Sequence, residues 1–329
     1  MKKYLLTLLS VFLTLGLMAG CNSSAEKNNE QKPAQSNEQT NTQEEGSNPF
    51  PVTIQDGVDE KVVIEKEPTK IVSLIPSNTE VAFALGLGEK IVGVSDFDNY
   101  PEEVSKKEKI GGMDFNVEKI LSLKPELVLA HASGAHNSAE GLQQLRDAGI
   151  SVLVVNDAQN LDQVYESITM IGKASGTEEK AEEMISEMKT KFENIQKTAS
   201  EIPEDKQKSV FLEVQPAPEI YTAGKNTFMN ELLTLVGAKN AAADQEGWVK
   251  ITEEAIIELN PDVIVTTYGY YSENPVEQIK SREGWDSVTA VRDGQIYDIH
   301  SDLVSRTGPR LVEGVEQLAK AIYPDYFKE

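Results

Sequence analysis

A nine-residue pattern occurs twice in this chain, with the second copy 136 positions after the first. The first copy runs from Glu118 to Glu126 and the second from Glu254 to Asp262, and a β-branched and aliphatic run follows each. Each copy predicts a capped short helix with a glutamate in its first turn, a proline that ends the helix, and then a strand. A chain that repeats this unit is expected to fold into two similar lobes facing each other across a cleft, with Glu118 and Glu254 at matching points on the rim.

The length of 329 residues also favours two domains. The chain carries 54 acidic and 31 basic side chains, and the net charge of -23 repels phosphate backbones, which argues against nucleic acid as a partner. A single cysteine cannot form a disulfide framework, and three histidines are too few for an obvious metal site. Stability therefore has to come from packed apolar cores.

The first 21 residues have the pattern of a secretion signal. Lys2 and Lys3 precede an apolar run that ends at Met18, and Cys21 follows. The last residues are similar to a lipoprotein cleavage box, which implies that Cys21 becomes the lipidated first residue of the mature chain. Two or more acyl chains, such as palmitate, hold a protein stably at a membrane, so we expect an anchor on the extracytoplasmic face of the cell membrane. An ordinary signal with a chance cysteine is the alternative.

The composition changes after the signal. Residues 22–50 are rich in Asn, Gln, Ser and Glu and contain almost nothing apolar, which predicts a disordered tether. We expect an N-terminal extension over residues 51–68, a first lobe over 69–176 and a second lobe over 203–329. Apolar residues at helical spacing between the lobes predict one long amphipathic connecting helix over residues 177–202.

Within the lobes, strands and helices alternate. Apolar runs predict strands at residues 70–75, 91–94, 126–130, 151–155 and 209–214. Ser77 and Glu80 have the spacing of a capping box that would open a helix ending at Gly86. Asn116 and Thr252 are the expected caps of the two repeated helices. Strands that alternate with helices, without tight hairpin turns, favour α/β lobes with mostly parallel sheets covered on both faces.

Several segments resemble, in order and spacing, the solute-binding lipoproteins of ABC importers in which one rigid helix joins two α/β lobes. These segments are Ser73–Glu80, Val92–Ser95, Asn116–Pro125, Thr222–Gly224 and Gly247–Trp248. The resemblance extends over residues 71–323. It implies a monomer without catalytic activity or catalytic cofactor, which carries cobalamin, a ferric siderophore or haem to an ABC permease dimer with its ATPase subunits.

The repeated glutamates have a counterpart in this family. The resemblance implies that Glu118 and Glu254 engage arginines on the permease dimer, one glutamate per lobe. An exposed carboxylate also pairs well with arginine on general grounds, because a bidentate pair orients as well as attracts. A glutamate in the first turn of a helix can instead merely complement the helix dipole, so this alternative stays open for each residue.

Candidate ligand-binding residues follow from the same resemblance. The segments around Phe97, Tyr221, Trp248, Asp302 and Arg306 are most similar to the cobalamin-binding members of the family. A corrin is a broad apolar disc edged with amides, which requires flat rings against its faces and polar groups at its rim. Core packing is the alternative for the three aromatic residues, and a surface ion pair four residues apart is the alternative for Asp302 and Arg306.

Two further residues fall where relatives place pocket side chains, Ser77 and His131. For Ser77, a capping role alone is a sufficient alternative. For His131, the alternatives are a solvated loop histidine and a side chain that approaches the cobalt of the ligand. No residue is expected to bind a resident metal.

The other candidate functions are an enzyme related to two-lobed chelatases, and an adhesin or sensor lipoprotein that has kept the fold.

Overall fold

The computed structural model describes residues 49–328, which belong to one compact unit. The predicted signal, the lipidation residue Cys21 and nearly all of the predicted tether lie outside the described residues. Within residues 49–328, no helix is long and apolar enough to cross a membrane.

The N-terminal lobe contains a five-stranded sheet in the order β5-β4-β3-β6-β7, and every neighbouring pair is parallel. Its strands are β3 (Ile71–Ser73), β4 (Ile91–Val94), β5 (Glu108–Lys109), β6 (Leu127–His131) and β7 (Ser151–Val155). Its helices are α1 (Pro76–Ala84), α2 (Val117–Leu123), α3 (Ala132–Ala135), α4 (Ala139–Asp147) and α5 (Leu161–Ser175). The helix α5 was missed by the sequence analysis, although Asn160 caps its start and Gly176 ends it in the left-handed conformation.

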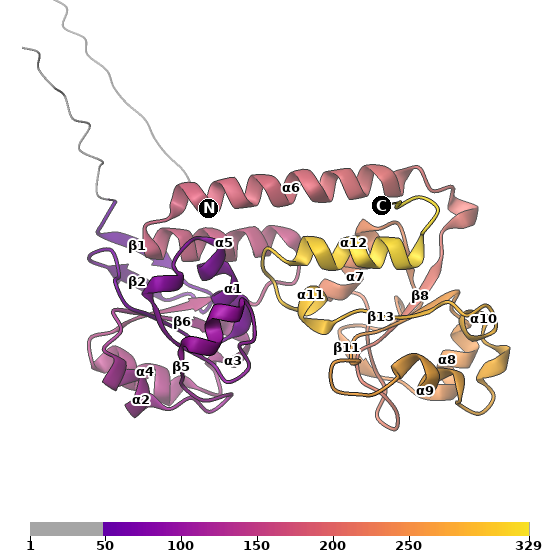
Figure 1. Ribbon diagram of the computed structural model, residues 1–329, viewed down its shortest axis with the longest axis horizontal. Helices are drawn as coiled ribbons and strands as arrows, with labels where there is room; N and C mark the ends of the chain where they lie inside the picture. The colour runs from indigo at the N-terminus through magenta and orange to yellow at the C-terminus, as the bar shows by residue number, and fades with distance from the viewer. Residues whose placement is uncertain (1–48, 329) are drawn as a thin grey trace, which may run out of the picture. The chain divides into compact units, whose positions relative to one another are not determined.

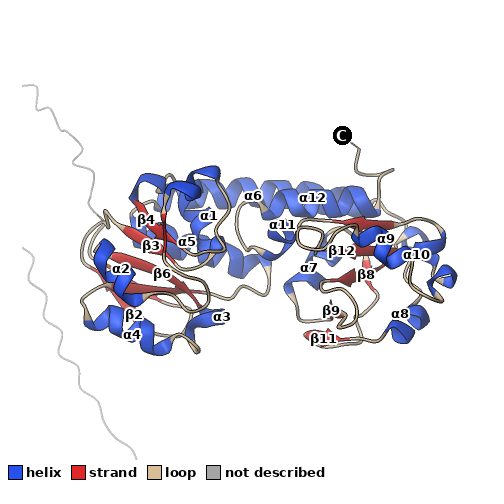
Figure 2. Cartoon of the chain, turned by 60° about the horizontal axis from the view of Figure 1, so that its bottom comes forward, coloured by secondary structure: helices blue, strands red, loops and turns tan. Residues whose placement is uncertain are grey.

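The C-terminal lobe repeats this plan with a four-stranded parallel sheet in the order β10-β8-β12-β13. Its strands are β8 (Ser209–Glu213), β10 (Lys239–Asn240), β12 (Val263–Thr266) and β13 (Ile296–Asp298). Its helices are α7 (Phe228–Leu235), α8 (Glu253–Leu259), α9 (Pro275–Lys280), α10 (Thr289–Arg292), α11 (Ser301–Ser305) and α12 (Leu311–Ile322). Figure 2 shows the strands of each lobe with helices on both sides. The predicted fold class, two similar α/β lobes with mostly parallel sheets, is therefore confirmed.

Two antiparallel pairs accompany the parallel sheets. A hairpin, β1 (Val52–Gln55) with β2 (Lys61–Ile64), precedes the first lobe, and β9 (Tyr221–Ala223) pairs with β11 (Trp248–Lys250) in the second. No tight hairpin was expected from the sequence, so the antiparallel pair of β1 and β2 is a correction. Short 3₁₀ helices connect other elements: η1 (Gly88–Lys90), η2 (Glu102–Lys106), η3 (Glu204–Lys206) and η4 (Trp285–Ser287).

One long helix, α6 (Glu178–Ser200), joins the lobes, as predicted. Figure 1 shows α5 and α12 lying along α6, each beside one part of its length, and both helices contact it. The approach of α5 is close, because a Cβ atom on Gly172 would lie 2.6 Å from the Cβ atom of Ala181. The inward face of α6 carries Met188, Phe192 and Ile195, which are buried.

The apolar cores follow the alternation of the strands. In β6, Leu127 and Leu129 belong to a large core that also includes buried residues of α5, α6, α12 and the second lobe. Val128 and Ala130 point to the other face and pack in a separate core with side chains of α2 and α4. The lobes are thus joined by a shared core on the α6 side.

The expected capping box at the start of α1 is wrong. The helix begins at Pro76, its N-cap is Ile75, and the N-cap makes no side-chain hydrogen bond. Ser77 lies inside the first turn, and Glu80 binds arginines of the second lobe instead of the helix start. The Glu80 side chain is held by two arginines more than 200 residues away in the sequence. A local sequence pattern carries no information about these partners.

Candidate functional site

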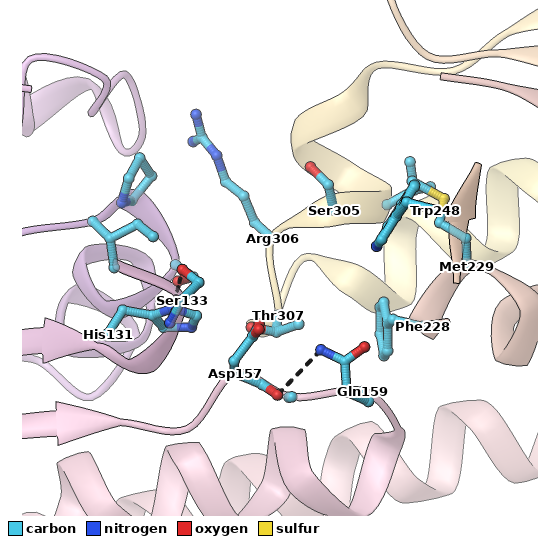
Figure 3. Close-up of a pocket in the computed structure, with 15 residues that line it drawn as sticks. His131, Ser133, Asp157, Gln159, Phe228, Met229, Trp248, Ser305, Arg306 and Thr307 are labelled. Atoms are coloured by element: carbon cyan, nitrogen blue, oxygen red, sulfur yellow. Dashed lines mark hydrogen bonds between the residues drawn. The ribbon is translucent and has the colours of Figure 1, made fainter. Parts of the chain in front are cut away.

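A cavity of about 340 Å³ lies between the two lobes. On the N-terminal side it is lined by residues at or just after the carboxyl ends of β3, β6 and β7, namely Ile75, Pro76, Ser77, His131, Ser133, Asp157, Ala158 and Gln159. On the C-terminal side it is lined by Phe228, Met229, Trp248, Val304, Ser305, Arg306 and Thr307. Figure 3 shows His131 and Ser133 on one side of this space and Trp248 on the other. Open α/β sheets bind ligands at this edge.

A second cavity of about 130 Å³ adjoins the first in the N-terminal lobe. It shares Ile75, His131 and Ser133 with the first cavity. Its other lining residues are mostly apolar, among them Leu74, Phe97, Met113, Phe115, Ala130 and Leu142. The two cavities therefore lie side by side, one with a mixed and one with an apolar lining, and together they are called the recess.

The structure brings most of the predicted ligand-binding residues to this recess. Ser77, His131, Trp248 and Arg306 line the first cavity, and Phe97 lines the second. Trp248 is 53% exposed and Phe97 is 54% exposed, so neither side chain belongs to a packed core. Large aromatic side chains left in contact with solvent at a concave surface are typical of binding sites.

Tyr221 and Asp302 are not among the residues that line either cavity. Tyr221 is half-buried in β9. Asp302 forms the ion pair with Arg306 that was considered as the alternative, with 3.0 Å between its Oδ1 atom and the arginine Nη2 atom. Direct contacts of these two residues with a ligand stay predictions.

Arg306 belongs to a charge network that connects the lobes. Its Nη1 atom donates to Glu80 Oε1 at 2.7 Å, and Arg310 donates to both oxygens of the same carboxylate at 2.9 Å. Asn99, from the first lobe, accepts from Arg306 at 2.7 Å and donates to Asp302 at 2.9 Å. The Glu80 side chain is 1% exposed. Two arginines and two carboxylates balance, so Arg306 brings no unmatched positive charge to the cavity.

The remaining electrostatics of the recess are simple. Among the residues lining the two cavities, Asp157 and Arg306 are the charged ones. Burial lowers the pKa of His131 below its usual value, and the nearby Asp157 carboxylate opposes this shift only in part. The imidazole is therefore neutral at neutral pH. Within residues 49–328, no group of three or more His, Cys, Asp or Glu side chains could hold a metal ion.

Glu118 and Glu254 have matching surroundings in the two lobes. Asn116 accepts a hydrogen bond from the backbone N–H of Lys119 at the start of α2, and Thr252 accepts from Ala255 at the start of α8. Both glutamates are exposed in the first turn of their helices. Figure 1 shows α2 and α8 on the side of their lobes away from α6. Hydrogen bonds from its own backbone N–H and from Thr252 lower the pKa of Glu254, which is thus ionised.

The repeated helices also end alike. Lys124 and Asn260 adopt left-handed conformations, with φ of 52° and 44°, and a proline follows each. The next strand, β6 or β12, lies beside β3 or β8 at the equivalent place in its sheet. Each glutamate thus occupies the same position in its lobe.

Several lining residues were missed by the sequence analysis. Asp157 comes two residues after a correctly predicted strand, so its place at the carboxyl edge of the sheet was a usable signal. Phe228 and Met229 open α7, which Thr227 caps. Ser305 and Thr307 flank Arg306 and carried no pattern of their own.

The chain shares extensive similarity with known proteins. A family model described as periplasmic binding protein matches residues 71–303. An uncharacterized ABC transporter substrate-binding lipoprotein of Bacillus subtilis, YvrC, is 52% identical over 320 residues, which is 97% of each chain. The vitamin B12-binding protein of Photorhabdus laumondii is 30% identical over 259 residues, 78% of this chain and 88% of that protein.

Solved structures of similar proteins carry several names. A possible iron-binding periplasmic solute-binding protein of Staphylococcus epidermidis is 40% identical, with a TM-score of 0.71 over 78% of this chain and 100% of that chain. The periplasmic heme-binding protein RhuT of Roseiflexus has 28% identity and a TM-score of 0.70, over 78% and 98%. The vitamin B12 binding protein BtuF of Vibrio cholerae has 26% identity and a TM-score of 0.65, over 78% and 96%.

Proposed function

The chain belongs to the periplasmic binding protein family, and on this premise we propose that it is the solute-binding subunit of an ABC importer that captures cobalamin between its lobes. The observation that carries the proposal is the recess between the lobes, which combines exposed aromatic rings with a charge-balanced arginine. Relatives named as vitamin B12-binding proteins support the choice of cargo.

The aromatic residues suit a flat cargo. Trp248 comes from the second lobe and Phe97 from the first, so rings from both lobes are available to the faces of one disc. A corrinoid is larger than the first cavity, so we expect part of it to lie against the exposed rims. Elsewhere in the second lobe, Tyr270 and Tyr271 are 59% and 56% exposed, and the ring centroid of Tyr270 lies 5.4 Å from that of His300.

The charge of the recess favours a cargo without net negative charge. Arg306 is neutralised by Glu80 and Asp302, and Asp157 contributes a negative charge. A cargo with several carboxylates would lose its hydration here without meeting an unmatched cation. The amide-rich edge of a cobalamin instead finds hydrogen-bonding groups such as Ser77 and Gln159.

A ferric siderophore or haem is the second candidate cargo. The names of the Staphylococcus epidermidis and Roseiflexus proteins favour it, since both refer to iron or heme and both identities are similar to or higher than that of the BtuF protein. A haem carries two propionates, and binding it in the recess would require these negative charges to be held near the Asp157 carboxylate.

The proposed cellular setting follows from the N-terminus and the relatives. We propose that lipid on Cys21 holds the protein on the extracytoplasmic face of the membrane, in agreement with the name of the Bacillus subtilis relative. The monomer would then deliver its cargo to a permease dimer, which docks on Glu118 and Glu254. The segments 22–50, 69–176, 177–202 and 203–329 remain our proposed tether, first lobe, connecting helix and second lobe.

Titration with cyanocobalamin tests the cargo. We expect the fluorescence of Trp248 to be quenched, because the corrin would lie against its exposed ring, whereas the second tryptophan, Trp285, is fully buried. Trp248→Ala is expected to weaken binding roughly 30-fold, since a central interface tryptophan contributes about 2 kcal/mol or more. A parallel titration of free tryptophanamide corrects for light absorbed by the cobalamin.

A desalting step supplies the independent readout. Protein mixed with cyanocobalamin and passed through a desalting column is expected to retain the visible absorption of the corrin. If micromolar cyanocobalamin neither changes the fluorescence nor elutes with the protein, the assignment of cobalamin is wrong. The same two measurements with haemin and with a ferric hydroxamate then decide the second candidate.

A further inference from the structure

His131 lies at the boundary between the two cavities, and its ring nitrogens are not equivalent. We infer that His131 offers its Nε2–H group as a hydrogen-bond donor to an acceptor on the cargo, and that it does not coordinate a metal. The inference rests on the proposed function, because it requires a cargo between the lobes. It makes His131 a residue that selects cargo by the position of a carbonyl or similar oxygen.

The hydrogen bonds of the Nδ1 atom indicate the tautomer. The backbone N–H of Ser133 donates to Nδ1 at 3.3 Å, and the Ser133 hydroxyl lies 2.8 Å from the same atom. A backbone N–H can only donate, so Nδ1 has to be unprotonated. In a neutral imidazole the proton is then on Nε2. His131 in this state also caps the short helix α3.

The surroundings keep the ring neutral. Burial lowers the pKa of His131, and Asp157 raises it by less. The ring thus carries one proton, and the contact with Ser133 assigns that proton to the nitrogen on the far side of the ring. Because His131 lines both cavities, a cargo that fills the recess would lie within reach of it.

Coordination of a metal would require a different arrangement. A metal binds the lone pair of an unprotonated nitrogen, and in this structure the unprotonated nitrogen is occupied by Ser133. To free a lone pair on Nε2, the proton would have to move to Nδ1, where the Ser133 N–H would oppose it. The cargo best suited to this site therefore brings a complete coordination sphere and leaves an acceptor for the Nε2–H group.

The chain contains a matched control for the tautomer. His300 caps α11 in the same manner, because its Nδ1 atom accepts from the backbone N–H of Asp302 at 3.2 Å. It is not among the lining residues of the two cavities. His136, the third histidine of the chain, is exposed. Because the chain has only three histidines, each imidazole signal in a nitrogen-15 NMR spectrum can be assigned to one ring.

The first experiment requires no cargo. Nitrogen-15 NMR of the imidazoles in the full-length protein distinguishes protonated from unprotonated ring nitrogens, and His131→Gln assigns the His131 signals. We expect His131 to show an unprotonated Nδ1 and a protonated Nε2 at neutral pH, and the signals of His300, whose Nδ1 atom also accepts a backbone N–H, serve as the reference. A His131 ring protonated on Nδ1 would overturn the inference, whatever the cargo is.

The second experiment measures the contact with the cargo. His131→Ala is expected to weaken cyanocobalamin binding about five- to tenfold, the size of one lost hydrogen bond. His131→Gln keeps an N–H donor without an imidazole and is expected to recover most of this loss. Equal affinities for wild type and His131→Ala would contradict the donor role.

Aquocobalamin separates donation from coordination, because its exchangeable water can be replaced by a histidine. We expect its visible spectrum to stay the same when it binds the protein. A spectral shift that disappears in His131→Gln would show coordination and overturn the inference. If no cobalamin binds the wild type, the proposed function fails, while the NMR result still decides the tautomer; a haemin Soret shift lost in His131→Gln would then refute the donor role.

Discussion

A variant that carries both Glu118→Arg and Glu254→Arg is expected to lose transport and to keep its affinity for cargo. The two glutamates are exposed, lie in the first turns of equivalent helices, and are not among the residues that line the recess. Each would meet an arginine of the permease, where a charge-assisted bidentate pair both attracts and orients. Reversal of their charge replaces attraction by repulsion at two points.

The expected effect is large because two pairs are lost together. Removing one partner of a desolvated charge pair costs about 2–5 kcal/mol, so the loss of two pairs weakens docking by roughly a thousandfold or more. Uptake of labelled cyanocobalamin by cells reports transport, and fluorescence titration of the purified variant reports affinity. Single variants are expected to show intermediate uptake.

A matched control changes the same amount of charge elsewhere. Glu183 and Glu187 are exposed on α6, and their replacement by arginine alters the net charge equally. This control variant is expected to transport normally. Normal uptake by the Glu118 and Glu254 double variant would remove the docking proposal, and equal loss in both double variants would indicate a nonspecific effect of charge.

The elements of the fold that were predicted correctly are those whose signals lie within a few neighbouring residues of the sequence. Asn116 and Thr252 cap their helices as expected, because a side-chain oxygen followed by an apolar repeat is a local signal. The connecting helix was predicted within two residues of each end, since 26 residues of uninterrupted amphipathic pattern have few alternatives. The hairpin of β1 and β2 was missed because its turn, Asp56 to Glu60, is longer than the two-residue turns that sequence reveals best.

The site was predicted less completely than the fold, for a related reason. Trp248 and Phe97 were proposed because their segments resemble those of the cobalamin-binding family members and lie in polar or loop-like contexts after strands, and both are exposed at the recess. The partners of Glu80 could not be proposed, since 226 and 230 positions separate it from Arg306 and Arg310. Its apparent role in a local capping box concealed the contact with the second lobe.

Glu80→Ala is the second variant with a large expected effect, on stability. The Glu80 side chain is 1% exposed, and its removal leaves the Arg306 and Arg310 guanidiniums close together without the carboxylate between them. Removing one partner of a buried ion pair typically costs about 3–5 kcal/mol, because the remaining charge is left unmatched. We expect the free energy of unfolding, measured by urea titration, to fall by about this amount.

A control and a double-mutant cycle identify the cause. Glu277→Ala removes an exposed pair with Lys280 and is expected to change stability by less than about 1 kcal/mol. If Glu80 acts through the two arginines, the losses of unfolding free energy caused by Glu80→Ala and Arg310→Ala do not add up in the double variant. The expected coupling energy is about 0.5–3 kcal/mol. Additive losses would show that Glu80 is merely a buried side chain of α1. Because Arg306 lines the recess, a real coupling also predicts weaker cyanocobalamin binding in Glu80→Ala, which connects the arrangement of the lobes to the capture of cargo.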